Sequence, residues 1–323
     1  MIRTVRNTAR LGGTVTLPGD KSISQRAILL NSIASGNAHV SNLCHGDDRA
    51  SILSCVGGLG ISITAHLNCA QTGAEECFLV QGQGPDGLTE PDTVLNAGNS
   101  GTATRLVAGL LAAQPFFSVL TGDESLRSRP MDRIITPLSE MGAHILGRDD
   151  NSFAPLAIRG GNLFGISFDQ PVASAQVKSS ILIAGIHATG ETTVVQPAKS
   201  RDHTERMMHA MGAAITIAGP RISVRRSTLN AMDVAVPGDI SGAAFWLVAA
   251  CVHPDARLTI RNVGINPTRT GVLDTLGSMG ANIQIKNVRE IGDEPVADIV
   301  AESSQLHGTE IAGDAVPRTI DEL

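Results

Sequence analysis

The amino-acid sequence predicts an α/β protein, and two features of the 323-residue chain support this fold class. Helix-like and strand-like segments alternate along the whole chain, as they do in α/β architectures. In addition, one short pattern occurs four times: an apolar residue, a glycine, a small or apolar residue, one further residue and an isoleucine. The glycines of the four copies are Gly60, Gly142, Gly212 and Gly280.

Each copy of this pattern follows a helix-like segment and leads into a run of alternating apolar residues, such as residues 215–217. Glycine just beyond a helix supplies the left-handed conformation that ends the helix. The pattern therefore predicts a helix, a glycine stop and a strand. The glycines lie 82, 70 and 68 residues apart. This period is too long for most solenoids and favours a duplicated α/β unit.

The remaining elements follow from apolar runs bounded by glycine, proline and polar residues. We expect helices over residues 24–34, 102–113, 173–187 and 241–252. We expect strands over residues 14–17, 116–120, 192–196 and 257–261. Hydrophobic residues make up 42% of the chain, enough to bury a sizeable core.

The composition excludes several classes of partner. The chain has one Trp and no Tyr, so it lacks the aromatic platforms that stack single-stranded nucleic acid. A net charge of −6 argues against a general binder of phosphate backbones. No apolar run approaches the roughly 20 residues that span a bilayer. We therefore expect neither a nucleic-acid nor a membrane partner.

The cysteines and the N-terminus indicate where the protein resides. The first residues lack the apolar stretch of a signal peptide, and the five cysteines form no C-x-x-C pair. Together these features predict reduced thiols and a cytoplasmic protein. Cys44, His45, His39 and His66 match no zinc-ligand spacing, so we expect no metal site.

Polar, Ser- or Gly-containing segments run into apolar helices at residues 18–26, 96–105, 173–180 and 237–242. Such residues cap helices, but helix N-termini also bind phosphate and carboxylate groups. Arg26 and Arg105 lie one turn into two of these helices, and Arg-rich loops occur at residues 127–133 and 200–206. The stock motifs for ATP, NAD and serine hydrolases are absent. These residues favour a site for a multiply anionic small molecule.

Six of these segments, in order, resemble the signatures of the 5-enolpyruvylshikimate-3-phosphate synthase family. They are LPGDKSISQRA at 17–27, GNSGTATR at 98–105, SLRSRPM at 125–131, SAQVKS at 174–179, SRDHTE at 200–205 and VPGDIS at 236–241. The resemblance covers essentially the whole chain. It implies transfer of the enolpyruvyl group of phosphoenolpyruvate to the 5-hydroxyl of shikimate 3-phosphate, a step of chorismate and aromatic amino-acid synthesis.

The same resemblance implies two domains, each an inside-out α/β barrel of three βαβαββ units. The first domain would comprise residues 1–18 and 237–323 and be incomplete, and the second would comprise residues 19–236 with three full units. Where the family continues for about a quarter of its length, this chain stops at Leu323. We therefore expect no measurable turnover from this polypeptide alone, and a monomer when it is complete.

Site residues are implied position by position. Shikimate 3-phosphate would contact Lys21, Ser22, Arg26, Ser174, Ala175, Gln176, Arg201 and Asp321. Ala175 replaces a serine of many relatives, so only its backbone could serve there. Phosphoenolpyruvate, or the inhibitor glyphosate in its place, would contact Lys21, Gly101, Arg129 and Gln176. Lys21 and Asp321 would be catalytic, with Asp321 taking the proton of the attacking hydroxyl. No cofactor is implied.

Two alternatives remain open. One is a non-catalytic or split fragment of such an enzyme that still binds shikimate 3-phosphate. The other is the sister enolpyruvyl transferase that acts on UDP-N-acetylglucosamine. That enzyme carries a cysteine in its catalytic loop, whereas residues 122–130 contain none.

Overall fold

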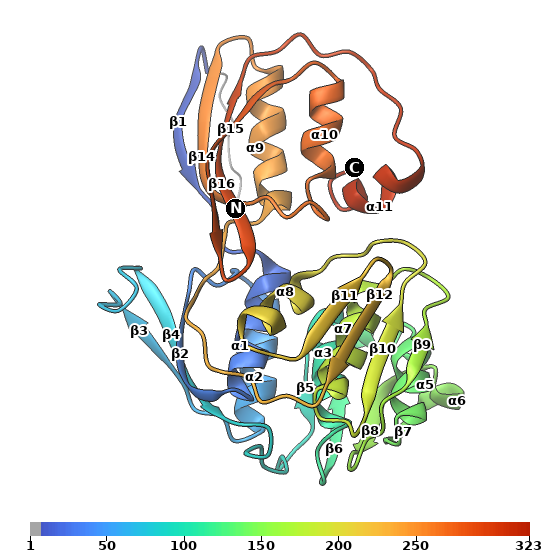
Figure 1. Ribbon diagram of the computed structural model, residues 1–323. Helices are drawn as coiled ribbons and strands as arrows, with labels where there is room; N and C mark the ends of the chain where they lie inside the picture. The colour runs from blue at the N-terminus through green and yellow to red at the C-terminus, as the bar shows by residue number, and fades with distance from the viewer. Residues whose placement is uncertain (1–7) are drawn as a thin grey trace. The chain divides into compact units, whose positions relative to one another are not determined.

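The computed structural model describes residues 8–323, and the chain divides into two compact units (Figure 1). Unit 1 comprises the residues up to Asp20 together with Pro237–Leu323, and unit 2 comprises Lys21–Val236. Unit 2 is therefore one continuous stretch of chain, whereas unit 1 is assembled from two.

The elements occur in the order β-α-β-α-β-β, and this order is repeated four times. The first copy comprises β1 (Leu11–Thr16), α1 (Lys21–Ser32), β2 (Ser35–Ser41), α2 (Asp47–Gly58), β3 (Ile63–Leu67) and β4 (Glu76–Gln83). The second comprises β5 (Leu95–Asn96), α3 (Gly101–Leu111), β6 (Phe117–Thr121), α5 (Asp132–Glu140), β7 (His144–Gly147) and β8 (Phe153–Arg159), with the short helices α4 (Glu124–Arg127) and α6 (Arg148–Asn151) inserted.

The third and fourth copies follow the same order. The third comprises β9 (Ser167–Asp169), α7 (Ala175–Gly185), β10 (Glu191–Val195), α8 (His203–Ala210), β11 (Ile215–Ala218) and β12 (Arg221–Arg225). The fourth comprises β13 (Val234–Ala235), α9 (Ile240–Val252), β14 (Ala256–Gly264), α10 (Gly271–Ser278), β15 (Asn282–Ile291) and β16 (Glu294–Glu302). The 3-10 helix η1 (Gly313–Ala315) and α11 (Val316–Thr319) come last.

The four repeated glycines end helices as the sequence predicts. Gly60, Gly142, Gly212 and Gly280 have φ angles of 86°, 109°, 88° and 90°. They follow α2, α5, α8 and α10 and precede β3, β7, β11 and β15. A side chain at such a φ is strained, so glycine is the residue that lets the chain leave the helix and enter the next strand.

The strands form four sheets of four strands each, in the orders β13-β2-β4-β3, β5-β6-β8-β7, β11-β12-β10-β9 and β1-β14-β16-β15. In every sheet three strands pair antiparallel, and one edge strand pairs parallel. The α/β class is thus confirmed as a mixed α/β fold. Because hydrogen bonding is confined to four separate sheets, the barrel arrangement stays a prediction.

Two edge strands are exchanged between copies. β5 and β9 pair within their own copies, whereas β1 pairs with β14 and β13 pairs with β2. The two chain crossings lie beside each other, since the Asp20 N–H donates to the Pro237 carbonyl at 2.8 Å. Unit 2 is therefore inserted into unit 1 at a single point.

Three long helices lie inside unit 2 and carry its core. In α1, every residue from Ser22 to Ser32 is buried, and α3 and α7 are buried over most of their length. Apolar residues on these helices, such as Leu29, Leu106 and Ile181, form one cluster with the inner faces of the sheets. Burial on all sides explains the many apolar residues of α3 and α7, whereas α1 also buries polar side chains such as Gln25, Arg26 and Asn31.

The prediction of reduced thiols is wrong for two cysteines, since Cys69, just beyond β3, forms a disulfide with Cys77 of β4. The two strands are neighbours in one hairpin, which brings the sulfurs together although the sequence contains no recognised disulfide spacing. Cys44, Cys55 and Cys251 are buried and take no part in a disulfide. Among the described residues, no helix is both long enough and apolar enough to cross a membrane.

Candidate active site

The candidate site in unit 2 lies at the N-terminal turns of its buried helices. The Gln25 side chain of α1 donates to the Ser100 hydroxyl at 2.7 Å, and Ser100 also caps α3 by accepting from the Ala103 N–H. The same Gln25 amide donates to Asp48 on α2 at 3.1 Å. A fully buried polar side chain thus holds the starts of α1, α2 and α3 together.

Arg26 is buried and joins three helices. Its guanidinium donates to the Thr204 hydroxyl of α8 at 2.6 Å, the Ser179 hydroxyl of α7 at 2.9 Å and the Ser22 carbonyl of α1 at 2.9 Å. Thr204 and Ser179 also hydrogen-bond each other at 2.6 Å. The predicted ligands Ser22 and Arg26 are therefore brought together with α7, which carries the predicted ligands Ala175 and Gln176, and with α8, which begins just after Arg201.

Arg105 connects the starts of α3 and α7. Its Nη1 donates to the Gln176 side-chain oxygen at 2.8 Å and to the Gly101 carbonyl at 3.1 Å. Desolvation lowers the pKa of Arg105, and the nearby positive charges of Arg129 and Arg133 lower it further. A guanidinium remains protonated near neutral pH after such a shift. The sequence marks Arg105 as a cation near a helix start but assigns it no ligand.

Gly101 lies directly against two guanidinium groups. A Cβ at this position would come within 2.8 Å of Arg105 Nη1 and 3.1 Å of Arg129 Nη1. Arg129 also donates to the Asn99 side-chain oxygen at 2.5 Å, and Asn99 donates to Asp123 at 2.7 Å. The Asn96–Arg105 segment and the Arg-rich loop thus meet in one region that holds two guanidinium groups, a chemistry suited to anionic ligands.

The other predicted residues of unit 2 surround this region. Lys21 begins α1, is half-exposed, and has its Nζ 3.9 Å from an Asp48 oxygen. Ser174 caps α7 by accepting from the Val177 N–H, and the carbonyl of Ala175 accepts from the Ser179 hydroxyl. Arg201 is half-buried in the segment between β10 and α8.

Asp321 belongs to unit 1, just beyond α11. Its Oδ2 lies 3.6 Å from Nη1 of Arg269, whose side chain is only 6% exposed. Arg269 also donates to the Ser241 hydroxyl at 2.7 Å and contacts Asp239 at 3.4 Å. Asp239 is the N-cap of α9, so one buried guanidinium connects the start of that helix to the predicted proton acceptor. No motif in the sequence marks Arg269, which sequence reasoning missed.

Within residues 8–323, no group of three or more His, Cys, Asp or Glu side chains is placed so that it could hold a metal ion.

The fold and these side chains define an α/β protein that presents helix N-termini and clustered guanidinium groups, a combination suited to phosphate and carboxylate ligands. Comparison with known proteins narrows this class. The model of the EPSP synthase (3-phosphoshikimate 1-carboxyvinyltransferase) family matches residues 5–323. The chain belongs to this family.

Curated relatives and solved structures are similar to this chain over nearly its whole length. The 3-phosphoshikimate 1-carboxyvinyltransferase of Magnetococcus marinus is 50% identical, with 99% of this chain and 71% of the relative covered. The 3-phosphoshikimate 1-carboxyvinyltransferase of Geotalea uraniireducens is 48% identical, with 99% of this chain and 73% of the relative covered. The structure of EPSP synthase from Acinetobacter baumannii superposes on this chain with a TM-score of 0.89 at 44% sequence identity. The match covers 97% of this chain and 69% of the Acinetobacter chain.

Proposed function

We propose that the protein to which these 323 residues belong transfers the carboxyvinyl group of phosphoenolpyruvate to the 5-hydroxyl of shikimate 3-phosphate and releases phosphate. The expectation that the 323-residue polypeptide alone shows no measurable turnover stays a prediction. The observation that carries the proposal is the 50% identity to a 3-phosphoshikimate 1-carboxyvinyltransferase over 99% of the chain. The reaction is a step of the shikimate pathway. The positively charged helix starts of unit 2 support the proposal, because both substrates carry a phosphate and a carboxylate.

Shikimate 3-phosphate would be held by side chains of α1, α7 and the segment before α8. The proposed ligands are Lys21, Ser22, Arg26, Ser174, Gln176 and Arg201, with the backbone of Ala175. The hydrogen bonds from Arg26 to Ser179 and Thr204 support this grouping, since they hold the three elements in one arrangement.

Phosphoenolpyruvate would lie against Lys21, Gly101, Arg129 and Gln176, with Arg105 added from its place beside Gly101. These cations would stabilise the negative charge of the substrate and of the tetrahedral intermediate, because they are fixed before the reaction begins. The absence of a side chain at Gly101 leaves the two guanidinium groups accessible at close range.

The chemistry is an addition followed by an elimination. A proton adds to the methylene carbon of phosphoenolpyruvate, and the 5-hydroxyl of shikimate 3-phosphate attacks the neighbouring carbon to give a tetrahedral intermediate. A proton is then lost from the new methyl group as phosphate leaves, which restores the carbon–carbon double bond. Asp321 would take the hydroxyl proton, and the ion pair with Arg269 would hold its carboxylate in one orientation. Lys21 is the other proposed catalytic residue.

We further propose that units 1 and 2 correspond to the two globular domains of the family, each with the inside-out barrel arrangement. A monomeric protein is part of the same proposal. So is a cytoplasmic location, which rests on the family and no longer on reduced thiols, since Cys69 and Cys77 form a disulfide.

Calorimetry with shikimate 3-phosphate and with shikimate tests the binding assignment. Shikimate 3-phosphate should bind about 30-fold tighter or more, because removal of its phosphate leaves charge-assisted hydrogen bonds of about 2–4 kcal/mol unmade. Equal affinities would contradict the assignment. Phosphate release measured with both substrates then separates an enzyme from a chain that binds shikimate 3-phosphate without turnover.

A further inference from the structure

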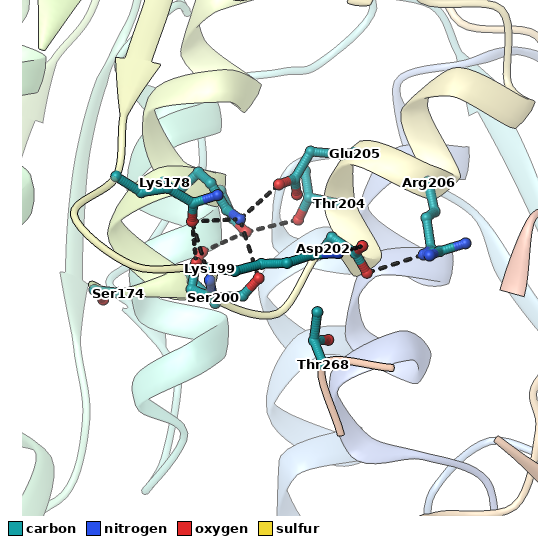
Figure 2. Close-up of polar contacts among 12 residues, drawn as sticks. Ser174, Lys178, Lys199, Ser200, Asp202, Thr204, Glu205, Arg206 and Thr268 are labelled. Carbon is teal, nitrogen blue, oxygen red and sulfur yellow. Dashed lines mark hydrogen bonds and ion pairs between the residues drawn. The ribbon is translucent and has the colours of Figure 1, made fainter. Parts of the chain in front are cut away.

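Lys178 and Glu205 form an ion pair inside unit 2, between α7 and α8 (Figure 2). The Lys178 Nζ lies 2.6 Å from Glu205 Oε1, and the two side chains are 0% and 2% exposed. A buried ion pair is costly to desolvate and is weak evidence for stability by itself. Its presence beside the candidate site therefore requires another explanation.

The ammonium group of Lys178 reaches two further acceptors. It donates to the Gln196 side-chain oxygen at 3.3 Å and to the Ser200 carbonyl at 3.5 Å. The same Gln196 oxygen accepts from the Ser200 N–H at 3.1 Å and from its hydroxyl at 2.8 Å. Lys178 and Gln196 thus fix both the backbone and the side chain of Ser200, which precedes Arg201.

A cavity of about 600 Å³ borders the same segment, and Lys199, Asp202, Glu205 and Ile217 are among the residues that line it. The hydrogen bonds that Ser200 makes with Lys178 and Gln196 therefore contribute to holding the segment beside this open space.

We propose that Lys178 and Glu205 are positioning residues that hold Ser200 and Arg201 for the phosphate of shikimate 3-phosphate; this use of the segment rests on the proposed function. Lys178 is four residues beyond Ser174 on α7, and Glu205 is four residues beyond Arg201 at the start of α8. The ion pair therefore couples the two elements that carry the proposed phosphate ligands. Neither residue itself contacts the substrate.

The informative variant replaces both charges, Lys178→Met with Glu205→Leu. A single change would leave one buried charge uncompensated and destabilise the fold, whereas a buried pair is often replaced by apolar residues without loss of stability. Lys286→Met is the matched control, because Lys286 is an exposed lysine of β15 in unit 1.

Two measurements on the full chain test the proposal. The first is amide hydrogen exchange over residues 196–205 without ligand, which should become about tenfold faster or more in the double variant while the melting temperature stays near that of the parent. The second is calorimetry, in which affinity for shikimate 3-phosphate should fall about 10- to 100-fold and affinity for shikimate should change less than about threefold.

Unchanged exchange together with an unchanged affinity ratio in the double variant would show a purely structural pair and overturn the proposal. Equal loss of affinity for both ligands would do the same. If the parent chain itself did not prefer shikimate 3-phosphate, the proposed function would fail, and the exchange measurement would still decide whether Lys178 and Glu205 hold the segment. Lys286→Met should match the parent in both measurements.

Discussion

Arg105 of α3 and Gln176 of α7 are joined by a 2.8 Å hydrogen bond from guanidinium Nη1 to amide Oε1. The Gln176 amide nitrogen makes a second hydrogen bond to α3, donating to the Thr102 hydroxyl at 2.8 Å. The starts of two buried helices are therefore connected in both directions. This arrangement fixes Gln176, which we propose as a ligand of both substrates, and keeps a cation beside Gly101.

Replacing Arg105 should weaken phosphoenolpyruvate binding more than shikimate 3-phosphate binding. In Arg105→Met the apolar chain fills similar space, but the cation and its bond to Gln176 are lost. We expect phosphoenolpyruvate affinity, measured by calorimetry in the presence of shikimate 3-phosphate, to fall about 10- to 100-fold. Arg105→Lys should recover only part of it, since one ammonium cannot reproduce the fork of a guanidinium. Wild-type affinity in Arg105→Met would contradict the assigned position.

A methyl group at Gly101 should discriminate against the smaller substrate. In Gly101→Ala, the new Cβ would meet the guanidinium groups of Arg105 and Arg129 at 2.8 and 3.1 Å, so both must move. We expect about tenfold weaker binding of phosphoenolpyruvate and of glyphosate, and a change of less than about threefold for shikimate 3-phosphate. Calorimetric titration of each of the three ligands into separate samples of the same Gly101→Ala preparation measures these affinities. Parallel losses for all three would indicate general distortion of α3.

The folded chain should lose stability in mild acid through His187, which follows α7. Its ring Nε2 is buried without a hydrogen-bond partner among the described residues, and burial lowers its pKa to about 4. Asp86 opposes this shift and Arg226 adds to it. Because the unfolded pKa is about 6.5, the contribution is present above that pH and is lost as pH falls toward 4.

The expected loss between pH 7 and pH 5 is about 2 kcal/mol in the free energy of unfolding. Urea unfolding at the two pH values measures it. In His187→Gln the difference should shrink by about that amount, since the glutamine at position 187 takes up no proton on unfolding. An unchanged difference would assign the acid sensitivity to other groups.

Removal of the disulfide should destabilise unit 2. Cys69 and Cys77 close a loop of eight residues, and a loop of this size corresponds to about 2–3 kcal/mol of unfolded-chain entropy. We expect the Cys69→Ser/Cys77→Ser variant to melt at a lower temperature than the oxidised protein. The variant should match the parent under reducing conditions. Intact-mass measurement confirms the redox state, and identical melting of oxidised and reduced parent would refute the expectation.

Elements determined by local sequence were predictable. The glycines after α2, α5, α8 and α10 were identified by their recurrence, because the conformation that ends a helix depends on that residue alone. The buried helices were recognised as apolar runs. The start of α1 was placed at residue 24 rather than Lys21, because its polar first turn is buried by contacts with other elements that local sequence does not reveal.

Features that depend on distant pairing were not predictable. Lys178 lies in an apolar helix, and its partner Glu205 is separated from it by a strand and a loop. Arg269 and Asp321 are ion-paired although α10, β15 and β16 separate them in the sequence. Of the candidate site, the motif residues could be identified from sequence, whereas the side chains that hold them in place required the tertiary structure.

The exchange of β1 and β13 has a consequence for synthesis on the ribosome. β1 is made early, but its partner β14 follows about 245 residues later, as the pairing of Leu11 with Ala256 shows. At typical translation rates of about 5–20 residues per second, β1 waits about 12–50 seconds for that strand. The whole of unit 2 is synthesised in this interval. We expect unit 2 to reach its fold while the first strand of unit 1 is still unpaired. The nascent chain then completes unit 2 before unit 1, whose two segments flank unit 2 in the sequence.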